Sequence, residues 1–380
     1  MFDEIASLSH EPDRMFSQAA KRLAEEGRYH QLFELRLVQR RFELGISLGQ
    51  DLPLDELEDS LRVRLEDAYL EACREVGQLM LEAGKIRDAW TYLRPAGDKA
   101  TMRRRLECVV PTEDSADELI ALALHEGIDP ERGFAWLLAQ RGTCNAITEL
   151  EGICGSLPIT DQIACATVLV RHMHDELLGN LKGHLQRLKQ PPPETHSIVE
   201  LLAAHPELLD EGAYHVDTSH LATSVRFARL LTEPKFLRLA IELAEYGRRL
   251  ARDLQYPDHP PFEDTYPTHL LLFRATLGEE VESALEFFSE QAQSAEVELE
   301  GTGALETYLI LLERTGRSGE ALDEYAKLVP ADCALSHHAP TLVHLAQLSN
   351  RWDRYLEICQ QRNDVVGFAA GQISKNRKSP

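Results

Sequence analysis

Apolar residues recur at spacings of three and four along almost the whole chain, and runs that alternate between apolar and polar residues are nearly absent. The first pattern indicates amphipathic helices, whereas alternation would indicate half-buried strands. The clearest case is a helix predicted over residues 161–190. Its apolar stripe consists of Val170, Met173, Leu177, Leu181, Leu185 and Leu188. The pattern predicts an all-α protein.

Turns that contain glycine, proline or asparagine separate the predicted helices at intervals of about 15 to 20 residues, which favours stacked antiparallel helix pairs. In three places an alanine follows the turn glycine by five or six positions. These pairs are Gly84 and Ala89, Gly278 and Ala284, and Gly316 and Ala321. The small residue lets two helices cross closely, and larger residues that follow it, such as Phe288 and Tyr325, can fill the groove of the next pair.

This order of turn glycine, small residue and larger residue resembles tetratricopeptide (TPR) repeats, whose period is about 34 residues. The match covers about a third of the chain; the copy at Gly278 is looser, and the first copy, around Gly27, is degenerate. The resemblance implies a right-handed α-solenoid of antiparallel helix pairs that binds proteins or peptides, and it implies no enzymatic activity. The stretch from Arg141 to His269 departs from the pattern, so we expect an atypical central segment.

The clearest break in the chain is the triproline Pro191-Pro192-Pro193, which ends the long predicted helix. We therefore predict two regions. Residues 1–190 form an N-terminal helical-repeat region that ends in the long helix, and residues 191–380 form a C-terminal TPR-like region that carries the candidate polar site.

The charge and the composition exclude several classes of partner. A formal net charge of -23 opposes binding to nucleic acid, which requires clustered cations, and the run Arg103-Arg104-Arg105 is interpreted as a solvated helix face. No apolar run approaches the roughly 18 residues that span a bilayer, and the start Met1-Phe2-Asp3-Glu4 lacks the cations of a signal peptide. The seven cysteines are scattered without a C-x-x-C pair. We expect a cytoplasmic protein with no membrane or nucleic-acid partner.

Three short islands of histidine and carboxylate interrupt the helical pattern, at residues 171–176, 214–220 and 259–264. In the second island, His215 and Asp217 point the same way if the segment is extended, and His220 returns towards them from the first turn of the next helix. In the first island, His174 is the histidine that projects towards the apolar stripe. Imidazole and carboxylate are the ligands of Zn, Fe and Mn sites. We predict that His174, His215, Asp217 and His220 hold such a divalent transition metal in a central pocket.

Each of these residues also has an ordinary structural interpretation. His174 can be a core-edge histidine that bonds to a neighbouring carbonyl, and Asp217 can be the N-cap of a helix with His220 packed at its start. The proline-stiffened loop at residues 256–266 can be the rim of a pocket or a plain connector, and its Thr265 is predicted to cap the next helix. A helix is predicted to end at Gly142, which places Cys144 in the first turn of the next helix. Cys144 is the only cysteine considered as a nucleophile, and a packing role is its alternative.

Two functions follow, and the sequence leaves open whether the chain is an enzyme. With a metal bound, the protein could activate water or polarise a carbonyl of a small neutral substrate, with Asp217 or Glu176 as the base and His269 as the acid. Asp217 and His269 are thus the candidate catalytic residues. The alternative is a non-enzymatic TPR-like scaffold that binds a protein or peptide. The metal hypothesis requires His174, His215 and His220 to converge, whereas the scaffold hypothesis expects them to be dispersed.

Overall fold

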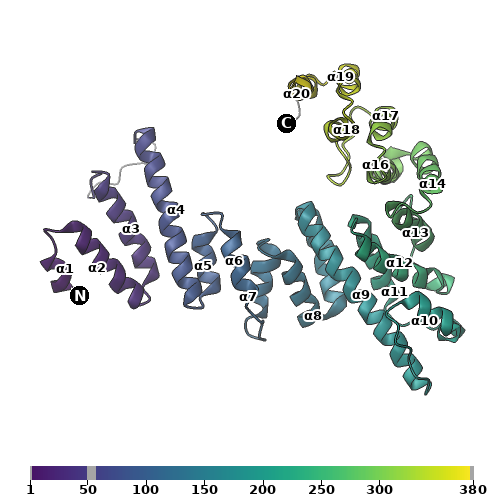
Figure 1. The fold of residues 1–380 in the computed structure, drawn as a ribbon, viewed down its shortest axis with the longest axis horizontal. Helices are drawn as coiled ribbons and strands as arrows, with labels where there is room; N and C mark the ends of the chain where they lie inside the picture. The colour runs from purple at the N-terminus through teal and green to yellow at the C-terminus, as the bar shows by residue number, and fades with distance from the viewer. Residues whose placement is uncertain (1, 49–56, 377–380) are drawn as a thin grey trace. The chain divides into compact units, whose positions relative to one another are not determined.

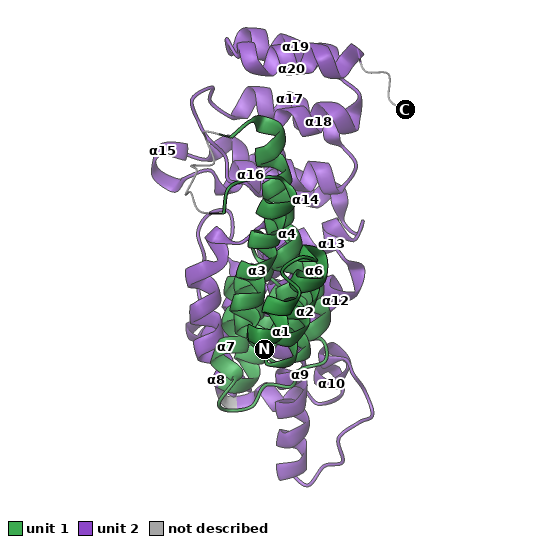
Figure 2. Ribbon diagram, turned by 90° about the vertical axis from the view of Figure 1, so that its left-hand side faces the viewer, with its two compact units in different colours: residues 1–140 green, residues 141–380 purple. Residues whose placement is uncertain are grey.

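The computed structural model describes residues 2–48 and 57–376, and all regular structure in these two ranges is helical (Figure 1). The all-α prediction is confirmed. The chain divides into two compact units, Met1–Gln140 and Arg141–Pro380 (Figure 2). The division falls inside α8 (Pro130–Ile153), next to Gly142, whose backbone angles of φ 76° and ψ 169° interrupt the helix. This break agrees with the helix end predicted at Gly142.

The first unit is a series of helices that pack mainly on their neighbours in the chain. It contains α1 (Phe2–Ser7), α2 (Pro12–Glu25), α3 (Tyr29–Glu43), α4 (Asp59–Glu82), α5 (Ile86–Leu93), α6 (Lys99–Leu106) and α7 (Ala116–Ile120), followed by a π turn at Ala121–His125. Buried side chains from these helices form one continuous core, which includes Leu32, Met80 and Met102.

The pair α4 and α5 has the packing expected from its small residues. Gly84 forms the turn with a φ of 77°, and Ala89 is fully buried. A Cβ atom on Gly77 of α4 would lie only 2.6 Å from Cγ of Leu93 on α5. The absence of a side chain at Gly77 therefore allows these two helices to approach closely.

The second unit continues the succession of helices. It contains the end of α8, α9 (Ile159–Arg187), α10 (Ile198–Ala204), α11 (Thr218–Phe227), α12 (Pro234–Arg248), α13 (Thr265–Thr276), α14 (Val281–Ser294), α15 (Val297–Glu300), α16 (Gly303–Arg314), α17 (Ser318–Leu328), α18 (Leu342–Ser349), α19 (Trp352–Gln361) and α20 (Val365–Asn376). Short 3-10 segments occupy Cys154–Ser156, Pro206–Gly212, Ala228–Leu230 and Arg252–Leu254.

The two repeat-like turns of this unit also agree with the pattern in the sequence. Gly278 and Gly316 have φ angles of 84° and 78°, which favour glycine, and the alanines that follow them, Ala284 and Ala321, are fully buried. Because α14 packs against α16, and α16 against α17, helix pairs follow one another here.

The long helix α9 connects to both sides of the triproline at residues 191–193. It packs against α11 and α12, and Lys182 Nζ lies 2.6 Å from the backbone oxygen of Thr195, beyond the prolines. The compact division at Gln140–Arg141 therefore differs from the boundary predicted at 190/191. The prolines end α9 but do not end its packing. Within the described ranges, no helix is both long and apolar enough to cross a membrane.

Candidate ligand-binding pocket

His174, a predicted metal ligand, lies on α9 with only 4% of its surface exposed. Its Nε2 atom is 2.8 Å from Oε2 of Glu242 on α12. Glu242 also accepts hydrogen bonds from the Ser197 hydroxyl and the Ile198 N–H at the start of α10. Burial raises the pKa of Glu242, but these hydrogen bonds outweigh it and bring that pKa below its ordinary value. His174 therefore joins a network that ties three helices together, with a carboxylate as its partner instead of the carbonyl we considered.

His215 lies in the segment before α11 and has different partners. Its Nε2 atom is 2.9 Å from Nδ1 of His184 on α9. Its backbone N–H donates to the hydroxyl of Tyr246 on α12 over 2.8 Å, and its Nδ1 atom lies 3.1 Å from that same oxygen. Burial, together with the nearby His184 and Arg187, lowers the pKa of His215 to about 4. At neutral pH this imidazole is uncharged and links α9 to α12.

Asp217 is the N-cap of α11, as its ordinary interpretation predicted. Its Oδ1 atom accepts hydrogen bonds from the backbone N–H groups of Ser219 and His220, over 2.9 and 3.2 Å, and from the Ser219 hydroxyl. The hydroxyl bond is the largest cause that lowers the pKa of Asp217. The contact between Asp217 and His220 thus runs through the backbone of His220.

The four predicted ligands do not come together in one cluster. Over residues 2–48 and 57–376, no group of three or more His, Cys, Asp or Glu side chains is arranged to hold a metal ion. His174 pairs with Glu242 and His215 pairs with His184, so the prediction missed both partners. The signal for His184 was its position, because both His174 and His184 flank the apolar stripe of α9.

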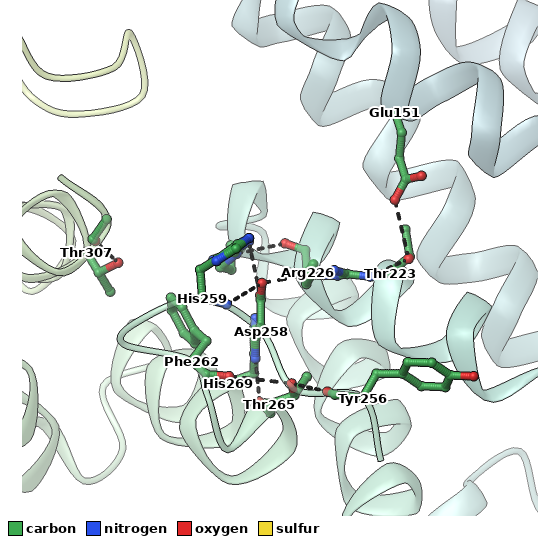
Figure 3. Close-up of polar contacts among 12 residues, drawn as sticks. Glu151, Thr223, Arg226, Tyr256, Asp258, His259, Phe262, Thr265, His269 and Thr307 are labelled. Carbon is green, nitrogen blue, oxygen red and sulfur yellow. Dashed lines mark hydrogen bonds and ion pairs between the residues drawn. The ribbon is translucent and has the colours of Figure 1, made fainter. Parts of the chain in front are cut away.

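His269, the predicted acid, is fully buried on α13. Its Nδ1 atom faces the backbone oxygen of Thr265, and its ring centroid lies 4.2 Å from that of Phe262 (Figure 3). Burial, with a further contribution from Arg229, lowers its pKa to about 3. Its Nε2 atom is buried and has no hydrogen-bond partner in the described part of the chain.

The loop before α13 is held by side chains that the sequence had placed in other roles. We expected Thr265 to cap α13, but the helix begins at Thr265 with Asp264 as its N-cap. The Thr265 hydroxyl instead donates to the backbone oxygen of Tyr256 over 2.6 Å, which closes the loop on itself (Figure 3). On the other side of the loop, Pro260 lies close to Gly303. A Cβ atom added to Gly303 would lie 3.0 Å from the backbone oxygen of Pro260.

Cys144, the candidate nucleophile, is exposed.

A large pocket lies elsewhere in the second unit. It has a volume of about 850 Å³ and is lined by α8, α9, α11, α16, α18 and the segments between them. We call it the arginine pocket. Its lining residues are Glu151, Cys154, Ile159, Gln162, Ile163, Thr223, Arg226, Phe227, Arg229, Leu230, Thr232, Asp258, Gly303, Glu306, Thr307, Ile310, Glu313, Arg314, His338 and Leu348.

One part of the arginine pocket is apolar. It includes Ile163 on α9, Phe227 on α11 and Ile310 on α16. Ile159 and Leu348, which also line it, keep 38% and 54% of their surfaces exposed. Because exposed apolar side chains gathered at a concave site gain free energy when a ligand covers them, this part of the pocket suits an apolar group.

The polar part of the pocket contains a shared carboxylate. Asp258, whose side chain is only 6% exposed, lies 4.0 Å from Arg226 Nη1 and 3.5 Å from Arg229 Nη2. Arg226 also donates to the Thr223 hydroxyl over 2.7 Å, and Thr223 reaches Glu151 (Figure 3). The Arg229 guanidinium lies 4.6 Å from the ring centroid of Phe262. Two guanidinium groups therefore share one carboxylate.

Arg314, at the end of α16, is a third cation in this pocket. Its Nη2 atom donates to the backbone oxygen of Arg229 over 2.9 Å, whereas its Nη1 atom is buried without a hydrogen-bond partner. No carboxylate of the described residues lies within 4.0 Å of its guanidinium. Burial lowers the pKa of Arg314 to about 10, although Glu313 opposes this effect. His338 Nδ1, another buried polar atom of the pocket, also has no hydrogen-bond partner among the residues described, and Asp258 Oδ2 has only its ion pair with Arg229 at 3.5 Å.

The sequence indicated this pocket only in part. Asp258 belongs to the loop that was considered as a possible rim, and it does line the pocket. The sequence did not predict that Arg226, Arg229 and Arg314 share a site. Arg314 lies 85 residues beyond Arg229 in the sequence, so only the packing of α16 brings the two together.

Comparisons of the chain with protein-family models, with curated proteins and with solved structures found no match.

Proposed function

We propose that this chain is a non-enzymatic, TPR-like α-solenoid scaffold that binds a short segment of a partner polypeptide in the arginine pocket. The observation that carries the proposal is the pocket itself, in which apolar side chains and three arginines lie together. Stacked helix pairs characteristically present such concave surfaces to their partners.

The size and the lining of the pocket support a ligand of a few residues. Its volume of about 850 Å³ is within the range of pockets that enclose most of a drug-sized molecule, roughly 300–1,000 Å³. An extended peptide can place an apolar side chain against Ile163 and Ile310 while its polar backbone reaches the arginines. A ligand that is only apolar or only polar would leave part of the lining uncovered.

The surroundings of the candidate catalytic residues favour binding over catalysis. Asp217 is engaged as a helix cap and His269 is fully buried, and neither lines the arginine pocket. The hypothesis of a Zn, Fe or Mn site at His174, His215, Asp217 and His220 stays a separate prediction, and elemental analysis tests it.

A pair of leucine substitutions tests the proposal. Leu348 lines the pocket and is 54% exposed, whereas Leu299 on α15 is 81% exposed and does not line it. Both positions can accept arginine without burying a charge. Peptides selected from a displayed random library on the wild-type chain should bind Leu348→Arg at least about tenfold more weakly and Leu299→Arg unchanged. Equal binding by both variants, or a library that yields no binder, would contradict the proposal.

A further inference from the structure

We propose that the arginine pocket recognises the free C-terminal carboxylate of its partner segment, with Arg314 as the anchor. This inference rests on the proposed function and adds the chemistry of the ligand. It starts from Arg314, a buried side chain that forms no ion pair with the described residues.

Among the described residues, no carboxylate forms an ion pair with the guanidinium of Arg314, and the charge of the adjacent Glu313 offsets its burial only in part. Its only hydrogen bond runs from Nη2 to the neutral backbone oxygen of Arg229, while Nη1 is buried without a partner among the residues described. Moving a cation out of water costs several kcal/mol unless an anion and hydrogen bonds compensate it. Because a guanidinium can meet a carboxylate with two parallel N–H···O bonds, a bound carboxylate would supply both.

The neighbouring charges favour a singly charged ligand. Three arginines (Arg226, Arg229 and Arg314) and four carboxylates (Glu151, Asp258, Glu306 and Glu313) line the pocket, and two of the arginines share Asp258. Glu306 and Glu313 line the same pocket but already have partners. Glu306 accepts from Ser336 and Thr302, and Glu313 lies 2.9 Å from His344. These glutamates would repel a doubly charged phosphate more strongly than a carboxylate.

The apolar lining favours the end of a chain over an acidic side chain. Ile310 lies one helical turn before Arg314 on α16, and both line the pocket. A C-terminal residue carries its carboxylate and its side chain on the same Cα atom. An aliphatic residue at that position can therefore place its charge at Arg314 and its side chain beside Ile310. An internal Asp or Glu offers the charge without a separate apolar group.

Two matched peptide libraries test the inference on the full chain. Random N-acetylated hexapeptides with an aliphatic last residue are prepared as free acids and as carboxamides, and the amount retained by the protein is measured by mass spectrometry. The variants are Arg314→Gln and the control Arg238→Gln, whose side chain on α12 is 69% exposed and outside the pocket. Arg314→Lys keeps the positive charge but lacks the paired N–H donors of a guanidinium, and it replaces Arg314→Gln as the test variant if the glutamine variant does not fold.

We expect the wild-type chain and Arg238→Gln to retain free acids at least about tenfold more strongly than carboxamides. Arg314→Gln should lose this preference, Arg314→Lys should keep it in part, and neither change should lower the unfolding midpoint of the ligand-free protein. Equal retention of acids and carboxamides would overturn the inference while leaving the proposed function standing. The inference would also be overturned if Arg314→Gln kept the preference for free acids, or if Arg238→Gln lost that preference as fully as Arg314→Gln. A wild-type chain that retains neither library would contradict the proposed function as well.

Discussion

Acidification should destabilise the second unit through His269, and the size of this effect follows from its burial. The native imidazole is fully buried, and its pKa is lowered to about 3. In the unfolded chain a histidine has a pKa of about 6.5. Between these two values the unfolded state binds a proton that the native state does not, so stability is lost as the pH falls below about 6.5.

The expected loss depends little on the native pKa. At pH 5.0 the native imidazole is still neutral, so the stability lost is set by the difference between the pKa in the unfolded chain, about 6.5, and the pH of 5.0. At about 1.4 kcal/mol for each pH unit, this amounts to about 2 kcal/mol from His269 alone. Other buried histidines, such as His215, contribute in the same direction, so a variant must isolate the share of His269.

The variant His269→Phe removes the titrating group and keeps a ring beside Phe262 and Phe273. It loses the hydrogen bond to Thr265 but also removes a buried Nε2 atom that has no hydrogen-bond partner among the described residues, so we expect a small change in stability at pH 7.5. The exposed His259 of the adjoining loop provides the control His259→Gln.

Urea unfolding followed by pulse-labelling hydrogen exchange of peptides from α13 reports on this region at each pH. Between pH 7.5 and 5.0, the wild-type chain and His259→Gln should lose about 2 kcal/mol more than His269→Phe. If His269→Phe loses as much as the wild-type chain, the argument from a neutral buried histidine is wrong.

Three other measurements test the packing, the helix cap and the metal hypothesis. Gly247→Ala should lower the free energy of unfolding by about 3 kcal/mol, because its Cβ atom would lie 2.2 Å from a buried tyrosine ring. Gly179→Ala, on an open helix face, should raise it by about 0.5–1 kcal/mol, and the reverse order in denaturant titrations would contradict the packing. Asp217→Ala should lower it by about 1 kcal/mol and Asp217→Asn by much less, since asparagine also caps helices; equal losses would argue against a capping role. For a binding protein without a metal centre, elemental analysis should find less than one metal ion per chain, unchanged in His215→Ala combined with His220→Ala. Stoichiometric metal that this double variant loses would instead support the predicted site.

Local patterns in the sequence predicted the helices well because helices depend on nearby residues. Five of the six residues of the predicted stripe are buried on α9, whereas Leu188 is the C-cap of that helix and 47% exposed. The break at Gly142 and the cap at Asp217 were found where the sequence placed them. Ala284 and Ala321 are fully buried, as expected for small residues where two helices pack closely. Each of these features is decided within a few residues of the chain.

The side-chain partners of the candidate site could not be predicted in the same way. Whether His174 meets His215 or Glu242 depends on how α9 is rotated against α12, which carries Glu242, and against the segment before α11, which carries His215; both arrangements satisfy the same apolar pattern. The arginine pocket depends on still longer separations, since α16 brings Arg314 to Arg229. Periodicity identifies the buried face of a helix, but it does not identify the helix that packs on that face.

The most direct test of the central claim is to map where a bound peptide touches the chain. A free-acid hexapeptide selected on the wild-type protein is prepared with a photoreactive leucine as its last residue, cross-linked to the full chain and located by mass spectrometry. We predict cross-links to residues that line the arginine pocket, such as Ile163, Ile310 and Leu348, and their loss when an excess of the unmodified peptide is present. Cross-links that are displaced by the unmodified peptide but lie only outside these lining residues would contradict the account.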